Sequence, residues 1–182
     1  MGNISSPAPV LAIFAAFSRY GEAIDWAAER AAAALGPIAL RSEPYAFVET
    51  DYYQESMGAE LKKCFWAHET LVDPARLAEL KHMSNRWEEE YAALGRHPEP
   101  RPLNLDPGYV TPAKLVLAST KDHAHRMYLT DGIFAEVTLF YRDRAWQARE
   151  WTFPDYRRAD VQEFFTRARG HLMARLREAP PA

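Results

Sequence analysis

The chain has 182 residues, of which 48% are hydrophobic, and its formal net charge is -3. This length and composition suffice for one hydrophobic core without disulfides or metal, so we expect a single domain over residues 1–182, with flexible ends at 1–8 and 178–182. The acidic balance excludes a broad attraction to nucleic acid, and any basic site must be local.

The N-terminal apolar stretch at residues 7–17 is too short to span a bilayer and lacks the positive flank and cleavage site of a signal peptide. Cys64 is the only cysteine, and its neighbours Phe65 and Trp66 are typical of a packed strand rather than a reactive thiol. We therefore expect a cytoplasmic protein without a membrane partner.

The first part of the chain predicts the element order β-α-β-β-α-β. The expected strands are at 10–17, 42–48, 62–71 and 103–105. An alanine-rich helix at 21–35 ends at Gly36-Pro37, and Asp73-Pro74 caps a second helix that runs to residue 94 and ends at Gly95. This order is that of a ferredoxin-like fold.

The second part predicts an antiparallel β-meander followed by a helix. Strands are expected at 114–119, 125–129, 133–141 and 145–152, with Asp131-Gly132 as a hairpin turn. Apolar residues at helical spacing then predict a C-terminal helix over about 161–176, which Asp155 is placed to cap. The predicted fold class is α+β, with a ferredoxin-like first part extended by the meander and the helix.

The resemblance to a known family rests on several segments. They are Arg101-Pro102-Leu103-Asn104-Leu105-Asp106-Pro107-Gly108-Tyr109, Lys114-Leu115-Val116-Leu117-Ala118-Ser119, His125-Arg126-Met127-Tyr128-Leu129, Glu136-Val137-Thr138-Leu139 and Trp151-Thr152-Phe153-Pro154-Asp155-Tyr156. Through them the chain resembles the bacterial family known as domain of unknown function 4416 (DUF4416) over nearly its whole length. The resemblance implies an uncharacterised protein and no specific activity.

Asn104 and Asp106 are the first candidate ligand-binding residues. They lie two apart, so a strand projects both from one face, while Pro107-Gly108 suits the central positions of a type II turn. Two interpretations stay open: the pair contacts a ligand, or Asp106 hydrogen-bonds the backbone of its own turn.

Glu136 is the acid that most requires an explanation. Strict alternation over 133–141 places it between Phe134 and Thr138 on one face of a strand whose two faces both appear covered, and a buried carboxylate needs a partner. A two-residue hairpin loop brings His125 near it, whereas a three-residue loop places Arg126 opposite it. An acid-base or anion site and a structural ion pair are equally open.

A local basic run, which includes Lys114, Lys121 and Arg126, suits phosphate or carboxylate, although a solvated turn has the same composition. His123 and His125 lack a matching third ligand, so no metal site is predicted. The chain has no P-loop, Rossmann glycine motif or nucleophile elbow, and its cofactor is left open.

The sequence therefore predicts binding or processing of a small anionic metabolite that bears phosphate or carboxylate. The candidate catalytic residues are Glu136 and His125, and the candidate ligand-binding residues are Asn104, Asp106, Lys114, Lys121, Arg126 and Thr138. The alternatives are an RNA- or protein-binding adaptor and a structural or assembly protein without catalysis. Whether the protein is an enzyme and which oligomer it forms are left open.

Overall fold

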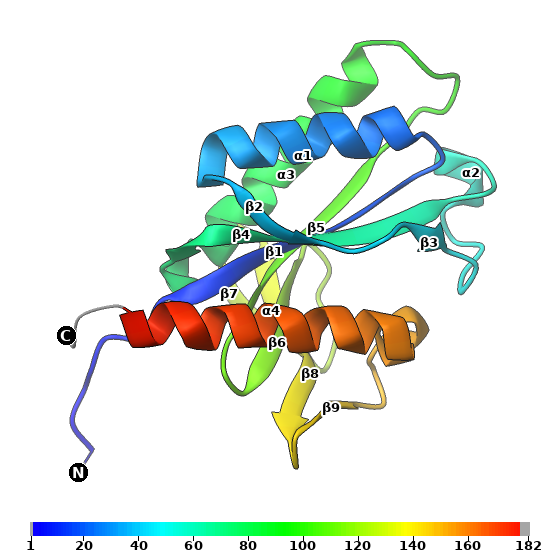
Figure 1. The fold of residues 1–182 in the computed structure, drawn as a ribbon. Coiled ribbons are helices and arrows are strands. Elements are labelled where there is room, and N and C mark those ends of the chain that lie inside the picture. Colours follow the sequence, from blue (N-terminus) through cyan, green and yellow to red (C-terminus); the bar gives the residue numbers. More distant parts are fainter. Residues whose placement is uncertain (1, 179–182) are drawn as a thin grey trace.

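The computed structural model describes residues 2–178, which form an antiparallel sheet and four α-helices (Figure 1). The strands are β1 (Val10–Ser18), β2 (Ile38–Arg41), β3 (Tyr45–Ala46), β4 (Lys62–Val72), β5 (Asn104–Val110), β6 (Lys114–Ser119), β7 (Met127–Thr130), β8 (Ile133–Arg142) and β9 (Ala145–Ala148). The helices are α1 (Gly21–Leu35), α2 (Gln54–Met57), α3 (Leu77–Ala93) and α4 (Ala159–Glu178), with 3-10 turns η1 (Pro74–Arg76) and η2 (Pro154–Arg157). The predicted α+β class is confirmed.

The sheet separates two helical layers. Its strand order is β2-β4-β1-β5-β6-β8-β7, with β3 paired to β4 and β9 paired to β8. Helices α1 and α3 pack on one face, against β1 residues such as Ala12 and Phe14, while α4 packs on the other face, against Leu11 and Ile13 (Figure 1). The central strand β1 is buried along its whole length because helices cover both of its faces.

Several predicted boundaries are confirmed and several shift for local reasons. Helix α1 has the predicted bounds, and Asp73 accepts a hydrogen bond from the backbone N–H of Ala75 at 2.8 Å, which caps the turn η1 before α3 rather than α3 itself. The strand predicted at 42–48 is confirmed only at Tyr45–Ala46, as β3, because Pro44 interrupts the stretch and β2 ends before it, at Arg41. The strand predicted at 145–152 ends at Ala148 because a turn closes from Arg149 to Thr152.

The flexibility expected for the two ends of the chain, at 1–8 and 178–182, stays a prediction. Residues 2–9 are exposed and have no regular secondary structure, whereas residue 178 is the last residue of α4. Met1 and residues 179–182, for which flexibility was also predicted, lie outside the described residues. Within residues 2–178, no helix has the length and apolar character needed to cross a membrane.

Candidate functional site

The candidate site lies in a fork between β5 and β6. These strands pair at three positions, from Gly108 with Leu117 to Val110 with Leu115. Before Gly108, β5 keeps its ladder with β1 as far as Asn104, whereas after Leu117 β6 continues along β8 as far as Ser119. The two strands therefore diverge toward the end of the sheet where β5 begins and β6 ends.

Pro107 and Gly108 stand at the base of this fork. Pro107 has no backbone N–H to donate to a ladder, and a Cβ atom on Gly108 would collide with the carbonyl oxygen of Val116. The predicted type II turn is wrong, because both residues lie inside β5 and Gly108 lacks the positive φ that the turn requires. The ladder between β5 and β6 instead stops at Gly108, beside Pro107, and Gly108 permits the close approach of these two strands.

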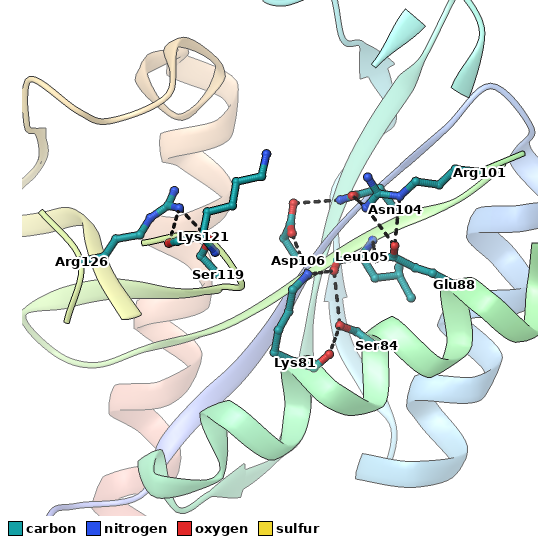
Figure 2. A network of polar contacts seen from close by, with 10 residues as sticks. All are labelled: Lys81, Ser84, Glu88, Arg101, Asn104, Leu105, Asp106, Ser119, Lys121 and Arg126. Carbon is teal, nitrogen blue, oxygen red and sulfur yellow. Dashed lines mark hydrogen bonds and ion pairs between the residues drawn. The ribbon is translucent and has the colours of Figure 1, made fainter. Parts of the chain in front are cut away.

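Asn104 and Asp106 project from one face of β5, as their spacing predicts. Leu105 between them packs into the core under α1 and α3, so the two polar side chains lie on the α4 side of the sheet. The amide Nδ2 of Asn104 donates to Oδ2 of Asp106 at 2.9 Å, and Nζ of Lys81 donates to Oδ1 of Asp106 at 3.1 Å (Figure 2). Asp106 therefore bonds side chains rather than a turn backbone.

Helix α3 holds the start of β5 in place through buried polar contacts. Nζ of Lys81 donates to the carbonyl oxygen of Leu105 at 2.9 Å, and Glu88 accepts from the N–H of Leu105 at 2.7 Å. Arg101 donates to Glu88 at 2.9 Å and also contacts the side-chain oxygen of Asn104. Figure 2 shows this network on one side of the fork, with Ser119, Lys121 and Arg126 on the other.

The pKa values of the acidic groups in this network shift in opposite directions. Burial acts to raise the pKa of Asp106, but the ammonium groups of Lys81 and Lys63 outweigh it and hold that pKa below its usual value. Burial instead raises the pKa of Glu88, and burial together with the nearby Asp106 charge raises the pKa of Tyr53 to about 12. The Asp106 side chain stays ionised and keeps 30% of its surface exposed, so it remains open to a ligand.

Glu136 lies on β8 across the fork, with three side-chain partners. Its Oε2 accepts from Nε of Arg126 at 2.8 Å and lies 3.2 Å from Nε2 of His125, and its Oε1 accepts from Oγ1 of Thr138 at 3.1 Å. The imidazole of His125 also stacks on the indole of Trp151, with the ring centroids 5.2 Å apart. Only 2% of the Glu136 side chain is exposed, so these partners satisfy a nearly buried carboxylate.

The hairpin explains why His125 and Arg126 both reach Glu136. Thr130 pairs with Ile133 across the predicted two-residue turn, in which Asp131 and Gly132 both have positive φ. A register shift between Tyr128 and Thr130 then moves the strand by one residue. The two loop lengths considered from the sequence thus describe one hairpin, a two-residue turn with a bulge beside it.

A second bulge changes the faces of β8. Leu115 pairs with Leu139 and Val116 pairs with Val137, which leaves Thr138 as the extra residue. The strict alternation predicted over 133–141 is therefore wrong beyond Val137, since Leu139 packs in the α4 core while Ala135 packs near the start of α3. Glu136 consequently lies on the α4 side of the sheet, the side that carries Asp106.

Lys63 and Asp155 form the most buried ion pair at the site. Nζ of Lys63 lies 2.6 Å from Oδ2 of Asp155, and the two side chains are 5% and 1% exposed. The ammonium is surrounded by the rings of Phe17, Phe47, Phe65 and Tyr156, with centroids 4.7 to 5.6 Å away. The predicted capping role of Asp155 is wrong: α4 begins four residues later, and the carboxylate points at Lys63.

These groups line a cavity of about 550 Å³. Its cationic side chains come from separate parts of the chain and are Lys63, Lys81, Arg101, Lys121 and Arg126. Four of them contact a carboxylate, whereas Nζ of Lys121 donates to the hydroxyl of Tyr52 at 3.0 Å. The carboxylates on the cavity wall are Glu49, Asp106, Glu136 and Asp155.

The structure brings together most of the residues selected from the sequence. Asn104, Asp106, Lys121, Arg126 and Glu136 line the cavity. His125 and Thr138 support Glu136 from outside the lining, and Lys114 is exposed at the opposite end of β6, where it pairs with Phe140. Among residues 2–178, no three His, Cys, Asp or Glu side chains are arranged to hold a metal ion.

Sequence reasoning missed Lys63, Lys81, Glu88 and Arg101. Lys63 shares a strand face with Phe65, which is buried, and Lys81 follows Leu77 by one helical turn on the buried face of α3. A lysine on an otherwise apolar face is the signal that could have identified both, because such a cation needs a buried partner. The partners themselves are distant in sequence and become visible only in the fold.

Comparison with curated proteins and with solved structures finds no match. A family model described as a domain of unknown function (DUF4416) matches residues 8–171, which include every strand and all the residues of the cavity wall. The resemblance inferred from the sequence motifs is confirmed. The chain belongs to the DUF4416 family.

Proposed function

We propose that the protein binds a small anionic metabolite, bearing phosphate or carboxylate, in the fork cavity. The observation that carries this proposal is the convergence of five cationic side chains on one cavity. The volume of about 550 Å³ falls in the range of small-molecule sites, and buried cations beside a cavity are suited to hold an anion away from water.

The anionic group would lie between Lys121 and Arg126. Lys121 contacts a hydroxyl rather than a carboxylate, so it has the most to gain from a negative ligand. Nη1 of Arg126 is already oriented by Ser119 at 2.7 Å and by the carbonyl oxygen of Lys121 at 2.9 Å. A guanidinium held in this way needs little reorganisation to bind an anion.

Asp106 and Asn104 would contact the polar remainder of the ligand from the other side of the fork. Asp106 is the acid on the cavity wall with the lowered pKa, and its ionised carboxylate accepts hydrogen bonds from hydroxyl or amino groups. A ligand with an anionic end and a hydrogen-bond donor would therefore be bound in one orientation.

Glu136 would orient Arg126 and His125, and its three side-chain contacts support this role over direct proton transfer. His125 lies outside the cavity lining, so in this proposal its ring, which stacks on Trp151, supports Glu136 and does not contact the ligand. We also propose that β1 to β5 form a ferredoxin-like unit, which the order β2-β4-β1-β5 supports.

Thermal denaturation with a panel of phosphates, sugar phosphates, nucleotides and carboxylates tests the proposal. A ligand at 100 times its Kd adds about 2.7 kcal/mol of stability, which raises the Tm of a chain of this size by roughly 5–10 °C. Lys121→Met should abolish the shift. Lys114→Met is the matched control, since Lys114 begins β6 at the end of that strand far from Lys121, and the variant should leave the shift unchanged. No shift with any compound, or equal losses in both variants, would contradict the proposal.

A further inference from the structure

The charged network forms only part of the cavity wall, and aromatic side chains form much of the remainder. They are Phe17, Phe47, Tyr52, Tyr53, Phe153 and Tyr156. The rings of Phe17, Phe47 and Tyr156 are buried, whereas Tyr52 is 67% and Phe153 is 47% exposed. Two exposed rings on the wall of one cavity leave flat apolar surface available to a ligand.

The backbone that carries these two rings is anchored by buried neighbours. Tyr53 packs against Phe17 with ring centroids 4.8 Å apart, and the ring of Tyr52 meets the ring of Tyr53 edge to face at 5.0 Å. The carbonyl oxygen of Phe153 accepts from the N–H of the buried Tyr156 at 3.1 Å. The two rings are therefore fixed at their bases, although they come from segments about one hundred residues apart in the sequence.

Lys121 joins the aromatic surface to the anion site. Its ammonium lies 4.4 Å from the centroid of the Tyr52 ring, close to the hydroxyl to which it donates. A ligand whose anionic group binds Lys121 and Arg126 thus reaches an exposed ring without leaving the cavity. The position of the cation selects ligands in which charge and a flat group are close together.

We infer that the ligand carries a heteroaromatic ring together with its anionic group, the class represented by nucleoside monophosphates. This inference rests on the proposed function. The ring would stack on Tyr52 or Phe153, the phosphate would bind Lys121 and Arg126, and Asp106 or Asn104 would accept or donate hydrogen bonds at the sugar. Stacking of a base on an aromatic side chain strengthens binding by at least about fivefold.

Calorimetric titration of the full chain tests the inference with three kinds of probe: inorganic phosphate, ribose 5-phosphate and the four common nucleoside monophosphates. At least one nucleotide should bind at least about fivefold more tightly than ribose 5-phosphate. Tyr52→Leu or Phe153→Leu should reduce the affinity for that nucleotide to the affinity for ribose 5-phosphate. Tyr52→Phe, which keeps the ring, should keep the difference between the two affinities. Tyr128→Leu, which removes an exposed ring on β7, should have no effect.

The outcomes separate the two proposals. Equal affinities for the nucleotides and ribose 5-phosphate, both lost in Lys121→Met, would overturn the aromatic inference and leave anion binding intact. A nucleotide preference that survives both leucine variants would also overturn it, because the preference would then arise elsewhere. If neither these probes nor any anion in the thermal panel binds, the proposed function itself fails, and the inference fails with it.

Discussion

The ion pair between Lys63 and Asp155 gives the sharpest prediction of stability. Its 2.6 Å contact is almost fully removed from water, with side-chain exposures of 5% and 1%. Lys63→Met keeps the length of the side chain but leaves the Asp155 carboxylate without its cation. The Asp155 carboxylate would then keep the hydrogen bond that it accepts from the hydroxyl of Tyr45, at 3.1 Å from Oδ2.

An isolated buried charge of this kind costs about 3–5 kcal/mol, and the Tyr45 hydrogen bond places the expected loss near the lower end, at about 3 kcal/mol. Native domains are stable by about 5–15 kcal/mol, so the loss is a large fraction of the total. For a chain of this size it corresponds to a decrease in Tm of roughly 6–12 °C.

Urea denaturation followed by circular dichroism measures the loss directly. Arg76→Met is the matched control, because the Arg76–Glu79 pair has a similar separation of 2.7 Å but side-chain exposures of 40% and 55%. An exposed pair contributes about 0–1 kcal/mol. The double variant Lys63→Met/Asp155→Leu should recover at least half of the loss, because it removes both charges. If Lys63→Met costs no more than Arg76→Met, the assignment of a tightly coupled buried pair is refuted.

Three further predictions concern individual positions. Gly108→Ala should lower the free energy of unfolding by about 1–3 kcal/mol, since its Cβ would meet the Val116 carbonyl, and a loss below about 0.5 kcal/mol in urea denaturation would argue against the close approach. Burial lowers the pKa of His68, so the contribution of this residue to stability should be present above pH of about 6.5 and decrease as pH falls through the folded pKa. His68→Gln should flatten this part of the plot of unfolding free energy against pH, and an unchanged plot would count against the burial of a neutral imidazole. Burial raises the pKa of the Cys64 thiol, so it should react with Ellman's reagent in urea but not in the native protein, and rapid native reaction would contradict its burial.

The sequence predicts helices and strands well where periodicity is local. The bounds of α1 and β6 are those predicted, because their apolar spacing and the residues that end them lie within the segment or directly beside it. The errors at Pro107-Gly108 and at Thr138 have a different origin. A Pro-Gly pair has the same local pattern in a turn and at a strand fork, and a bulge depends on the register of the partner strand.

The site is predictable in part for the same reason. Strand spacing placed Asn104 with Asp106, and the hairpin placed Arg126 and His125 near Glu136, since each relation is short-range. The contacts of Lys63 with Asp155 and of Lys81 with Asp106 join residues 92 and 25 positions apart. Pairs at such separations are set by the packing of α3, β5 and η2, which no local pattern encodes.

The most direct test of the fork as a ligand site is a titration of the ¹⁵N-labelled protein with ribose 5-phosphate, followed by the backbone amide resonances. The largest shifts should occur for the backbone N–H groups of residues 104–106, 108, 119–126 and 136, which lie on or beside the cavity wall, while residues 38–41 of β2 stay unchanged. Shifts concentrated outside the fork, or spectra that do not change at millimolar ligand, would contradict a ligand site in the fork.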